Sequence, residues 1–267
     1  MEPSLLGVAF LALVFVGSHL GLATGPVRSR LVARFGERGF FAIFSGVAAI
    51  SFALLAVWYA DHRTDGPPGL ALGAYPALRW PLVSILVLGL VFIIGGFARY
   101  TGGPYDVVDP DASRPPRGIE RVTRHPFLVG VALFAGAHAL LAPHLVGAVL
   151  MFSLAALACI GARHQDAKLR RRRGATFDDY LEHTSTLPFA AILAGRQRLA
   201  WRELPAGALV AGLALAVGLR SVHAQIFAHH GAWVILGTLG GALTIVAVSW
   251  ARDRRRSVTI RRPAPSS

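Results

Sequence analysis

Long runs of apolar residues alternate along the chain with short stretches that hold nearly all of the charged residues. A helix needs roughly 20 apolar residues to cross the hydrocarbon core of a bilayer, where backbone groups must be hydrogen-bonded within the chain. Seven runs approach this length and predict spans at about 4–23, 39–60, 80–98, 126–142, 145–162, 204–222 and 231–250. The sequence therefore predicts an all-α fold, a polytopic bundle of about seven transmembrane helices.

The basic residues predict the orientation of this bundle. Of the 27 Lys and Arg residues, only Arg63, Arg79 and Arg220 fall on the side of the N-terminus. Because Lys and Arg are enriched in cytoplasmic loops, we expect an N-out, C-in arrangement in the inner (cytoplasmic) membrane of a cell. The start MEPSLL lacks the basic residues of a signal peptide, so the first run is expected to stay as a span.

The spans fall into two regions and a tail. Residues 1–203 contain five spans and a polar cytosolic segment, residues 204–250 add two spans, and 251–267 form a basic tail that we expect to be disordered. In the polar segment, KLRRRR is followed by Phe177 and Tyr180. This combination suits an interfacial helix on anionic head groups, and a solvated loop explains it equally well.

Composition agrees with a membrane protein. The 267 residues are 54% hydrophobic and only 15% charged, with a mean hydropathy of +0.53. A net charge of +13 is typical of nucleic-acid-binding proteins, but here the basic residues flank apolar runs. We therefore expect the lipid bilayer as a partner and no nucleic acid. The single cysteine, Cys159, cannot form an intrachain disulfide.

Two of the ten histidines, His19 and His138, lie inside predicted spans. Ionisable residues at such depth are rare and are usually functional, although a hydrogen bond to a neighbouring helix also explains them. Small residues surround both, in VGSHLGLA and GAHALL. Zinc needs three or four ligands, whereas haem iron accepts one or two axial imidazoles, so the pair favours haem over zinc.

His125 cannot share a metal with His138, because thirteen helical residues separate them by roughly 20 Å. In TRHPFLVG, Pro126 suits the first turn of a helix that Thr123 or His125 caps. Arg124 and His125 are then candidates for contacts with head groups or an anionic ligand.

A second polar cluster, YADHRTDG, follows the second span and contains His62 and Arg63. A solvated turn explains it, and the alternative is that Arg63 donates to haem propionates. Arg28, on the opposite side of the bundle, is a candidate for the same role.

These motifs together resemble the NnrU / 15-cis-zeta-carotene isomerase family of membrane proteins. The resemblance covers about residues 10–203 and rests on SHLGLA, GERGF, YADHRTDG, TRHPFLVG with GAHALL, and HTSTLPFAAILAGRQRL. It implies a haem b protein with His19 and His138 as metal ligands. It also implies cis-to-trans isomerisation of the central double bond of a carotene, with a hydrophobic carotenoid as substrate.

The chain departs from the isomerase branch in two places. Leu157 and Ala158 stand where that branch has a further histidine, and about 204–250 adds two spans. The stretch HAQIFAHHG looks more like the end of NnrU proteins. In addition, His19 lies about 6 Å and His138 about 18 Å from the inner ends of their spans, so sharing one iron requires a shift of roughly 10 Å.

Two other functions stay open. An NnrU-like accessory protein that supports denitrification, through nitrite or nitric oxide reduction, fits the same motifs without catalysis. A membrane methyltransferase that uses S-adenosylmethionine fits Arg-His-Pro-x3-Gly followed by RGATFDDYLEHT, but ARHQDAKLRRRR replaces the usual Glu-rich stretch.

Overall fold

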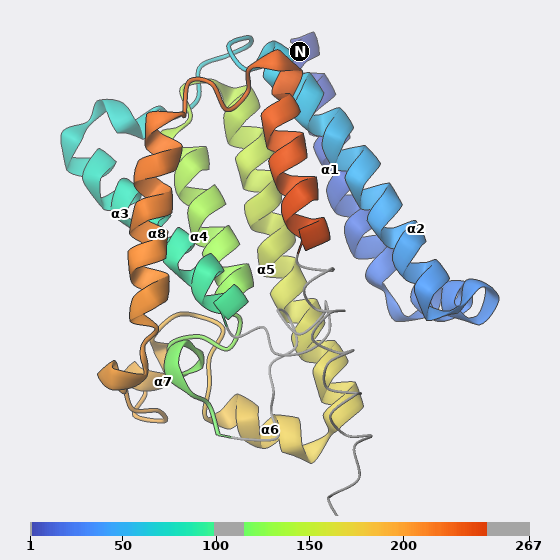
Figure 1. Cartoon of the computed structure of the whole chain (residues 1–267), viewed down its shortest axis with the longest axis vertical. Helices are drawn as coiled ribbons and strands as arrows, with labels where there is room; N and C mark the ends of the chain where they lie inside the picture. Colours follow the sequence, from blue (N-terminus) through green and yellow to red (C-terminus); the bar gives the residue numbers. More distant parts are fainter. Residues whose placement is uncertain (1, 99–114, 245–267) are drawn as a thin grey trace, which may run out of the picture.

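Helices account for nearly all regular structure in the computed structural model, which describes residues 2–98 and 115–244 (Figure 1). The long helices are α1 (Pro3–Ala23), α2 (Gly25–His62), α3 (Pro76–Ala98), α4 (Pro126–Leu141), α5 (Leu145–Arg173) and α8 (Ala206–Ser221). The shorter elements are α6 (Ala175–Glu182), α7 (Ala190–Leu193), η1 (Leu72–Ala74), η2 (Gly118–Arg121), η3 (Trp201–Glu203) and η4 (His229–Gly231). Residues 232–244 form one more helix. The all-α prediction is confirmed for the described residues.

Four of these helices, α1, α2, α3 and α5, are long and apolar enough to cross a membrane. Helices α4 and α8 are apolar but shorter, and the predicted seventh span continues into 245–250, outside the described residues. Large apolar side chains cover the outer faces; Leu13, Phe152 and Val217 are 70%, 69% and 70% exposed. Such faces suit contact with lipid tails. Seven spans and the N-out orientation stay predictions, as does the 251–267 tail, which is not among the described residues.

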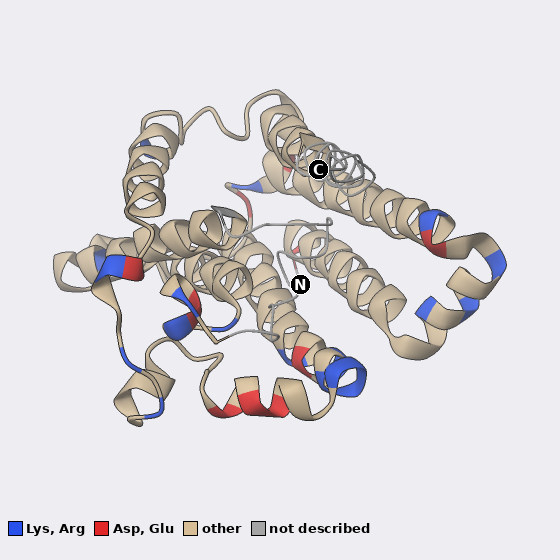
Figure 2. Ribbon diagram, turned by 60° about the horizontal axis from the view of Figure 1, so that its bottom comes forward, with Lys and Arg blue, Asp and Glu red and all other residues tan. Residues whose placement is uncertain are grey.

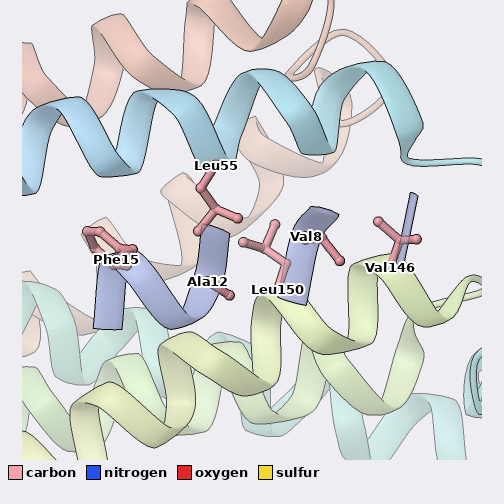
Figure 3. Packing of buried hydrophobic residues seen from close by; sticks show 6 residues of the cluster. All are labelled: Val8, Ala12, Phe15, Leu55, Val146 and Leu150. Carbon is pink, nitrogen blue, oxygen red and sulfur yellow. The ribbon is translucent and has the colours of Figure 1, made fainter. Parts of the chain in front are cut away.

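Helix α5 lies at the centre, with α1 and α2 on one side and α4 on the other (Figure 1). Three residues spaced along one face of α1 pack between α2 and α5. The buried cluster consists of Val8, Ala12, Phe15, Leu55, Val146 and Leu150 (Figure 3). The spacing of the α1 residues, four and then three, keeps them on a single stripe of the helix. This packing holds α1 against the centre of the bundle.

Helices α3 and α4 approach each other most closely where two glycines meet. A Cβ added to Gly130 would lie 2.6 Å from the Gly89 carbonyl oxygen and 2.7 Å from the Ile93 nitrogen. Small residues permit such an approach between apolar helices, whose association depends on van der Waals contact. The α3–α4 pair therefore depends on the absence of side chains at Gly89 and Gly130.

Helix α2 begins well before the predicted second span and bends at Gly36. Gly36 has a φ of +71° and a ψ of 173°, a backbone conformation that is almost exclusive to glycine. Across the bend, Arg28 donates a hydrogen bond to Glu37 over 2.6 Å and its guanidinium lies over the Phe40 ring. The basic stretch between the first two spans is thus helical.

Three connections meet at the end of the bundle that contains the short α4–α5 turn; we call this the hairpin end. Backbone hydrogen bonds join the loop after α2 to this turn, from Gly69 to Pro143 and from Ala71 to Ala142. The loop after α8 (222–231) crosses to the end of α2, where Arg63 donates to the Phe227 carbonyl. The region after residue 203 is therefore packed on the earlier helices, with α8 against α3 and η4 against α2.

The opposite end, which we call the basic end, carries most of the charged residues of the described chain. Figure 2 shows Lys and Arg at the α1–α2 connection and at the end of α5, with acidic residues along α6. Lys168 and Arg170 to Arg173 belong to α5, which ends at Gly174, and the separate helix α6 follows. The cationic run therefore extends a span, and only α6 corresponds to the predicted interfacial helix.

An ion cluster fastens the basic end together. Arg124 donates hydrogen bonds to both carboxylate oxygens of Asp166, the shortest being 2.6 Å from Nη2 to Oδ2. His125 Nε2 contacts Oδ1 of the same carboxylate over 2.7 Å. The Arg124 amide also donates to the Ser185 carbonyl, and Thr123 donates to Thr186. These bonds join the start of α4, the end of α5 and the segment after α6. His125 occupies the N-cap position of α4, but its side chain bonds to Asp166 and not to the helix amides.

A second ion pair closes the same end nearby. Arg121 binds Glu203 through two hydrogen bonds, and the Gly118 amide donates to the same carboxylate. The bonds from Arg121, followed by the one from Gly118, hold the pKa of Glu203 below its usual range. Since a lowered folded-state pKa favours the charged form, this contact contributes above the ordinary glutamate pKa and is lost as the pH falls below it.

The glycine contact between α3 and α4 gives a first prediction. Gly130→Ala is expected to destabilise the bundle by about 1–3 kcal/mol, because the methyl group meets backbone that cannot rotate away. Gly46→Ala is the matched control, since nothing lies within 4 Å of a Cβ at this α2 position. Alanine there should be neutral or stabilising by up to about 1 kcal/mol. Thermal unfolding of the detergent-solubilised variants measures both, and an unchanged Tm for Gly130→Ala would contradict the packing described.

The ion cluster at the basic end gives a second prediction. Asp166→Ala is expected to cost about 2–3 kcal/mol, somewhat less than for a fully buried pair, because it leaves Arg124 largely buried without its partner. The segment after α6 should loosen, so trypsin should cleave faster after Arg196 and Arg198. Asp178→Ala removes the exposed pair with Arg170 and should cost at most about 1 kcal/mol. If trypsin cleaved the two variants at the same rate, the ion cluster would not be what holds the segment after α6 in place.

Candidate functional site

His19 lies near the basic end of α1 and contacts two aromatic rings. Its ring centre is 4.8 Å from that of Phe44 in α2 and 5.6 Å from that of Phe15 in its own helix. Its Nδ1 is buried and has no hydrogen-bond partner among the described residues. No atom lies within 4 Å of a Cβ added to Gly17 or Gly21, so no helix packs closely on these neighbours. A buried, unpartnered imidazole nitrogen in an apolar setting is suited to a metal ligand.

His138 lies three residues before the end of α4, close to the hairpin end. Its Nδ1 is 3.0 Å from the Phe134 carbonyl oxygen. Because a carbonyl only accepts, Nδ1 must carry the proton, and in the neutral ring the lone pair is on Nε2. Ligating histidines commonly donate their second ring N–H in this way. The imidazole of His223 lies beside it, with ring centres 6.4 Å apart and planes within 8° of parallel.

The two predicted metal ligands occupy opposite ends of the bundle. His19 is four residues from the basic end of α1, whereas His138 is twelve residues from the start of α4, so they differ by roughly 12 Å in depth. Helix α5 also lies between α1 and α4 (Figure 1). The structure brings His138 together with His223 and does not bring it into ring contact with His19. Ligation by His19 and His138 stays a prediction.

Two of the polar residues after the second span, Asp61 and Arg63, form hydrogen bonds with the loop after α8. His62 stacks on Trp58 with ring centres 4.2 Å apart, and its Nδ1 lies 2.9 Å from the Trp58 carbonyl oxygen. Arg63 donates to the carbonyls of Ala60 and Phe227, and Asp61 binds His230. Arg63 and Asp61 therefore hold the end of α2 and the loop after α8 together, whereas His62 contacts only its own helix. Contact with a haem propionate stays a prediction for Arg63 and His62.

The remaining candidates lie at the basic end. Arg28 pairs with Glu37, and Arg124 and His125 pair with Asp166. His125 is 2% exposed, and its Nδ1 has no hydrogen-bond partner among the described residues. These arginines already bind carboxylates of the chain itself. Contact with lipid head groups stays a prediction for all three residues.

The donor set fits haem better than a metal ion held only by side chains. In the part of the chain that the structure describes, no group of three or more His, Cys, Asp or Glu side chains is placed to hold an ion. A zinc site needs such a group, but haem iron needs only one or two imidazoles. His19 and His138 each offer an imidazole in an apolar helix, so the residues present fit haem.

Sequence reasoning missed two residues that the structure makes prominent. Asp166 is the one acidic residue in ARHQDAKLRRRR, and an isolated carboxylate among cations beside a span is a signal for a buried ion pair. His223 lies just after the predicted sixth span, but nothing in the local sequence indicates that it faces His138. That contact depends on tertiary structure alone.

Comparison with known proteins gives two relatives and one family. The chain is 30% identical over 223 residues to the protein named 15-cis-zeta-carotene isomerase, chloroplastic, of Arabidopsis thaliana, covering 80% of this chain and 58% of that protein. It is 28% identical over 199 residues to the protein of the same name from Zea mays, covering 71% of this chain and 51% of that protein. The chain thus spans about half the length of the curated relatives it matches.

No solved structure matches the chain. The family described as NnrU protein matches residues 8–236, so the match continues through α8 and η4 into the last described helix. With most of its helices, both intramembrane histidines and His223 inside that match, the chain belongs to the NnrU family.

Proposed function

We propose that this protein is a membrane isomerase of the 15-cis-zeta-carotene type, which converts a cis double bond of a carotene to trans. The observation that carries the proposal is the 30% identity to an isomerase of that name over 80% of this chain. The apolar helices support it, because a carotene dissolves in the bilayer and can reach the protein only from lipid. Isomerisation exchanges no atoms, so the site needs no water and no acid–base pair.

The proposal includes haem b, with His138 as an iron ligand and His19 as the second ligand that the family resemblance implies. Ferrous haem, when bound, supplies electron density or Lewis acidity that lowers the double-bond character of a nearby polyene bond. The chain itself positions the histidine ligand and excludes water from it. The Phe134 carbonyl fixes the orientation and tautomer of His138, and the surrounding alanines, Ala135, Ala137 and Ala139, are buried and keep water away.

An accessory role without catalysis, in support of denitrification, is the second candidate. It is favoured by the NnrU family match, which covers residues 8–236. A haem-carrying protein of this kind would need the same histidines. A methyltransferase has no need of haem, and a haem absorption band in the purified protein would separate it from both.

Expression in bacterial cells that accumulate the tri-cis zeta-carotene tests the enzyme. We expect conversion to the 9,9′-di-cis isomer, measured by chromatography of extracted pigments. His138→Ala should lower conversion by about tenfold or more, because it removes an iron ligand. His183→Ala is the control, since His183 is exposed at the basic end. A wild-type protein with full haem loading and no conversion would favour the accessory role.

The oxidation state of the iron provides a further test. Anaerobic assays of the purified protein should show activity with reduced haem and little with oxidised haem, since only the ferrous form has the electron density that the proposal requires. Equal activity of the two forms would contradict this part of the proposal. The pigment products, analysed as in the cellular assay, are the measurement.

A further inference from the structure

The first part of α2 is a short helix between two breaks in the backbone. Thr24 separates it from α1 with an extended conformation, and the bend at Gly36 separates it from the rest of α2. We call this segment, residues 25–35, the elbow helix. Figure 1 shows it at the lower right, where it joins the end of α1 to the long part of α2. It is about 16 Å long by the rise of an α-helix.

The two ends of the elbow helix lie at nearly the same depth in the bundle. The Trp58 indole Nε1 donates to the Ser4 carbonyl over 3.1 Å, which fixes α2 relative to α1 at the hairpin end. Thr24 lies 20 positions from Ser4, and Gly36 lies 22 positions from Trp58. At the helical rise these are about 30 Å and about 33 Å, close to the thickness of the hydrocarbon core. The elbow helix therefore lies along the surface of a bilayer, where the head groups begin.

The side chains of the elbow helix suit this position. Arg30 and Arg34 are four residues apart, so they share one face of the helix, and both are exposed. Neither has an ion-pair partner among the described residues, and Arg34 contacts only the neighbouring Phe35 ring, 5.5 Å from its centre. Val27, Leu31 and Phe35 form the adjacent row, in which Phe35 is 50% exposed. Exposed arginines beside an exposed aromatic ring are typical of helices at the boundary between head groups and acyl chains.

The charge of this segment has one sign only. Residues 25–35 contain no acidic residue, and the carboxylate of the nearby Glu37 is bound by Arg28. In contrast, α6 at the same end of the bundle contains three acidic residues in ATFDDYLE, which disfavour an anionic surface. The preference of Lys and Arg for the cytoplasmic side explains that arginines occur here. It does not require two of them to lie unpaired on one helix face at the depth of the head groups.

We propose that the elbow helix is a binding site for anionic phospholipids. Arg30 and Arg34 bind the head-group phosphates, and the Phe35 ring lies at the boundary with the acyl chains. The guanidinium group matches phosphate through paired N–H donors, and each cation close to an anionic membrane surface strengthens the attraction. Bound lipid would hold the bend at Gly36 at the membrane surface. The site does not depend on haem or on the isomerase activity proposed above.

Native mass spectrometry of the full-length protein in detergent, titrated with phosphatidylglycerol, measures this binding. We expect the wild type to bind phosphatidylglycerol about tenfold more tightly than zwitterionic phosphatidylcholine. Arg30→Gln combined with Arg34→Gln should lower the affinity for phosphatidylglycerol by about tenfold, because two cations are lost from the surface. Both side chains are exposed, so this double variant should keep the Tm of the wild type when no lipid is added.

Two further variants make the result specific. Arg171→Gln combined with Arg172→Gln is the matched control, since it removes the same charge from exposed positions of α5 at the same end of the bundle. This variant should lower the affinity by about twofold at most. Phe35→Ala should weaken lipid binding by about threefold without any change of charge, an effect that a solvated pair of arginines would not show.

Three results would overturn the proposal. An equal loss of affinity in the two double variants would mean that phosphatidylglycerol responds to the overall charge of the basic end. Equal affinities of the wild type for phosphatidylglycerol and phosphatidylcholine would show that the head-group charge is not recognised. Displacement of bound phosphatidylglycerol by inorganic phosphate would indicate a site for free anions, in which the membrane has no part.

Discussion

A polar group inside an apolar helix bundle has no water to bind, and this constraint determines where the charges and imidazoles of this protein lie. Backbone groups are satisfied within the helices, and the charged side chains gather at the two ends. At the basic end, Arg124 meets Asp166, and Arg121 meets Glu203. Within the spans, the ring nitrogens of His138 and His62 bind carbonyls of the preceding helical turn. Buried ring nitrogens that have no hydrogen-bond partner among the described residues are the ones that remain able to bind a ligand.

The two ends of the bundle are held together by different kinds of interaction. The basic end is closed by ion pairs that join the start of α4, the end of α5 and the segment after α6. Four of its arginines, Arg28, Arg121, Arg124 and Arg170, bind carboxylates of the chain itself. The hairpin end is closed by backbone hydrogen bonds and by the loop after α8, and the nearly parallel imidazoles of His138 and His223 lie there.

Much of the fold could be predicted from the sequence, because the length and apolar character of a span are local properties. Helices α1 and α4 begin and end close to the predicted limits, α5 begins at the predicted residue, and Pro126 begins α4 as expected. The continuation of α5 through Lys168 to Arg173 was missed, since basic residues favour helix as well as they favour a head-group region. The metal-ligand role of His19 and His138 stays a prediction. The ring contact of His138 with His223 could not be predicted, because the two residues are 85 positions apart in sequence and no periodicity reports such a contact.

The loop after α8 connects these observations. Arg63, a candidate propionate ligand in the sequence, donates instead to the Phe227 carbonyl 164 positions later, and Asp61 binds His230 on the same loop. The same loop carries His223, whose imidazole lies nearly parallel to that of His138, and the tautomer of His138 is set by the Phe134 carbonyl. The polar residues at the end of α2 therefore fix the position of the loop that carries His223.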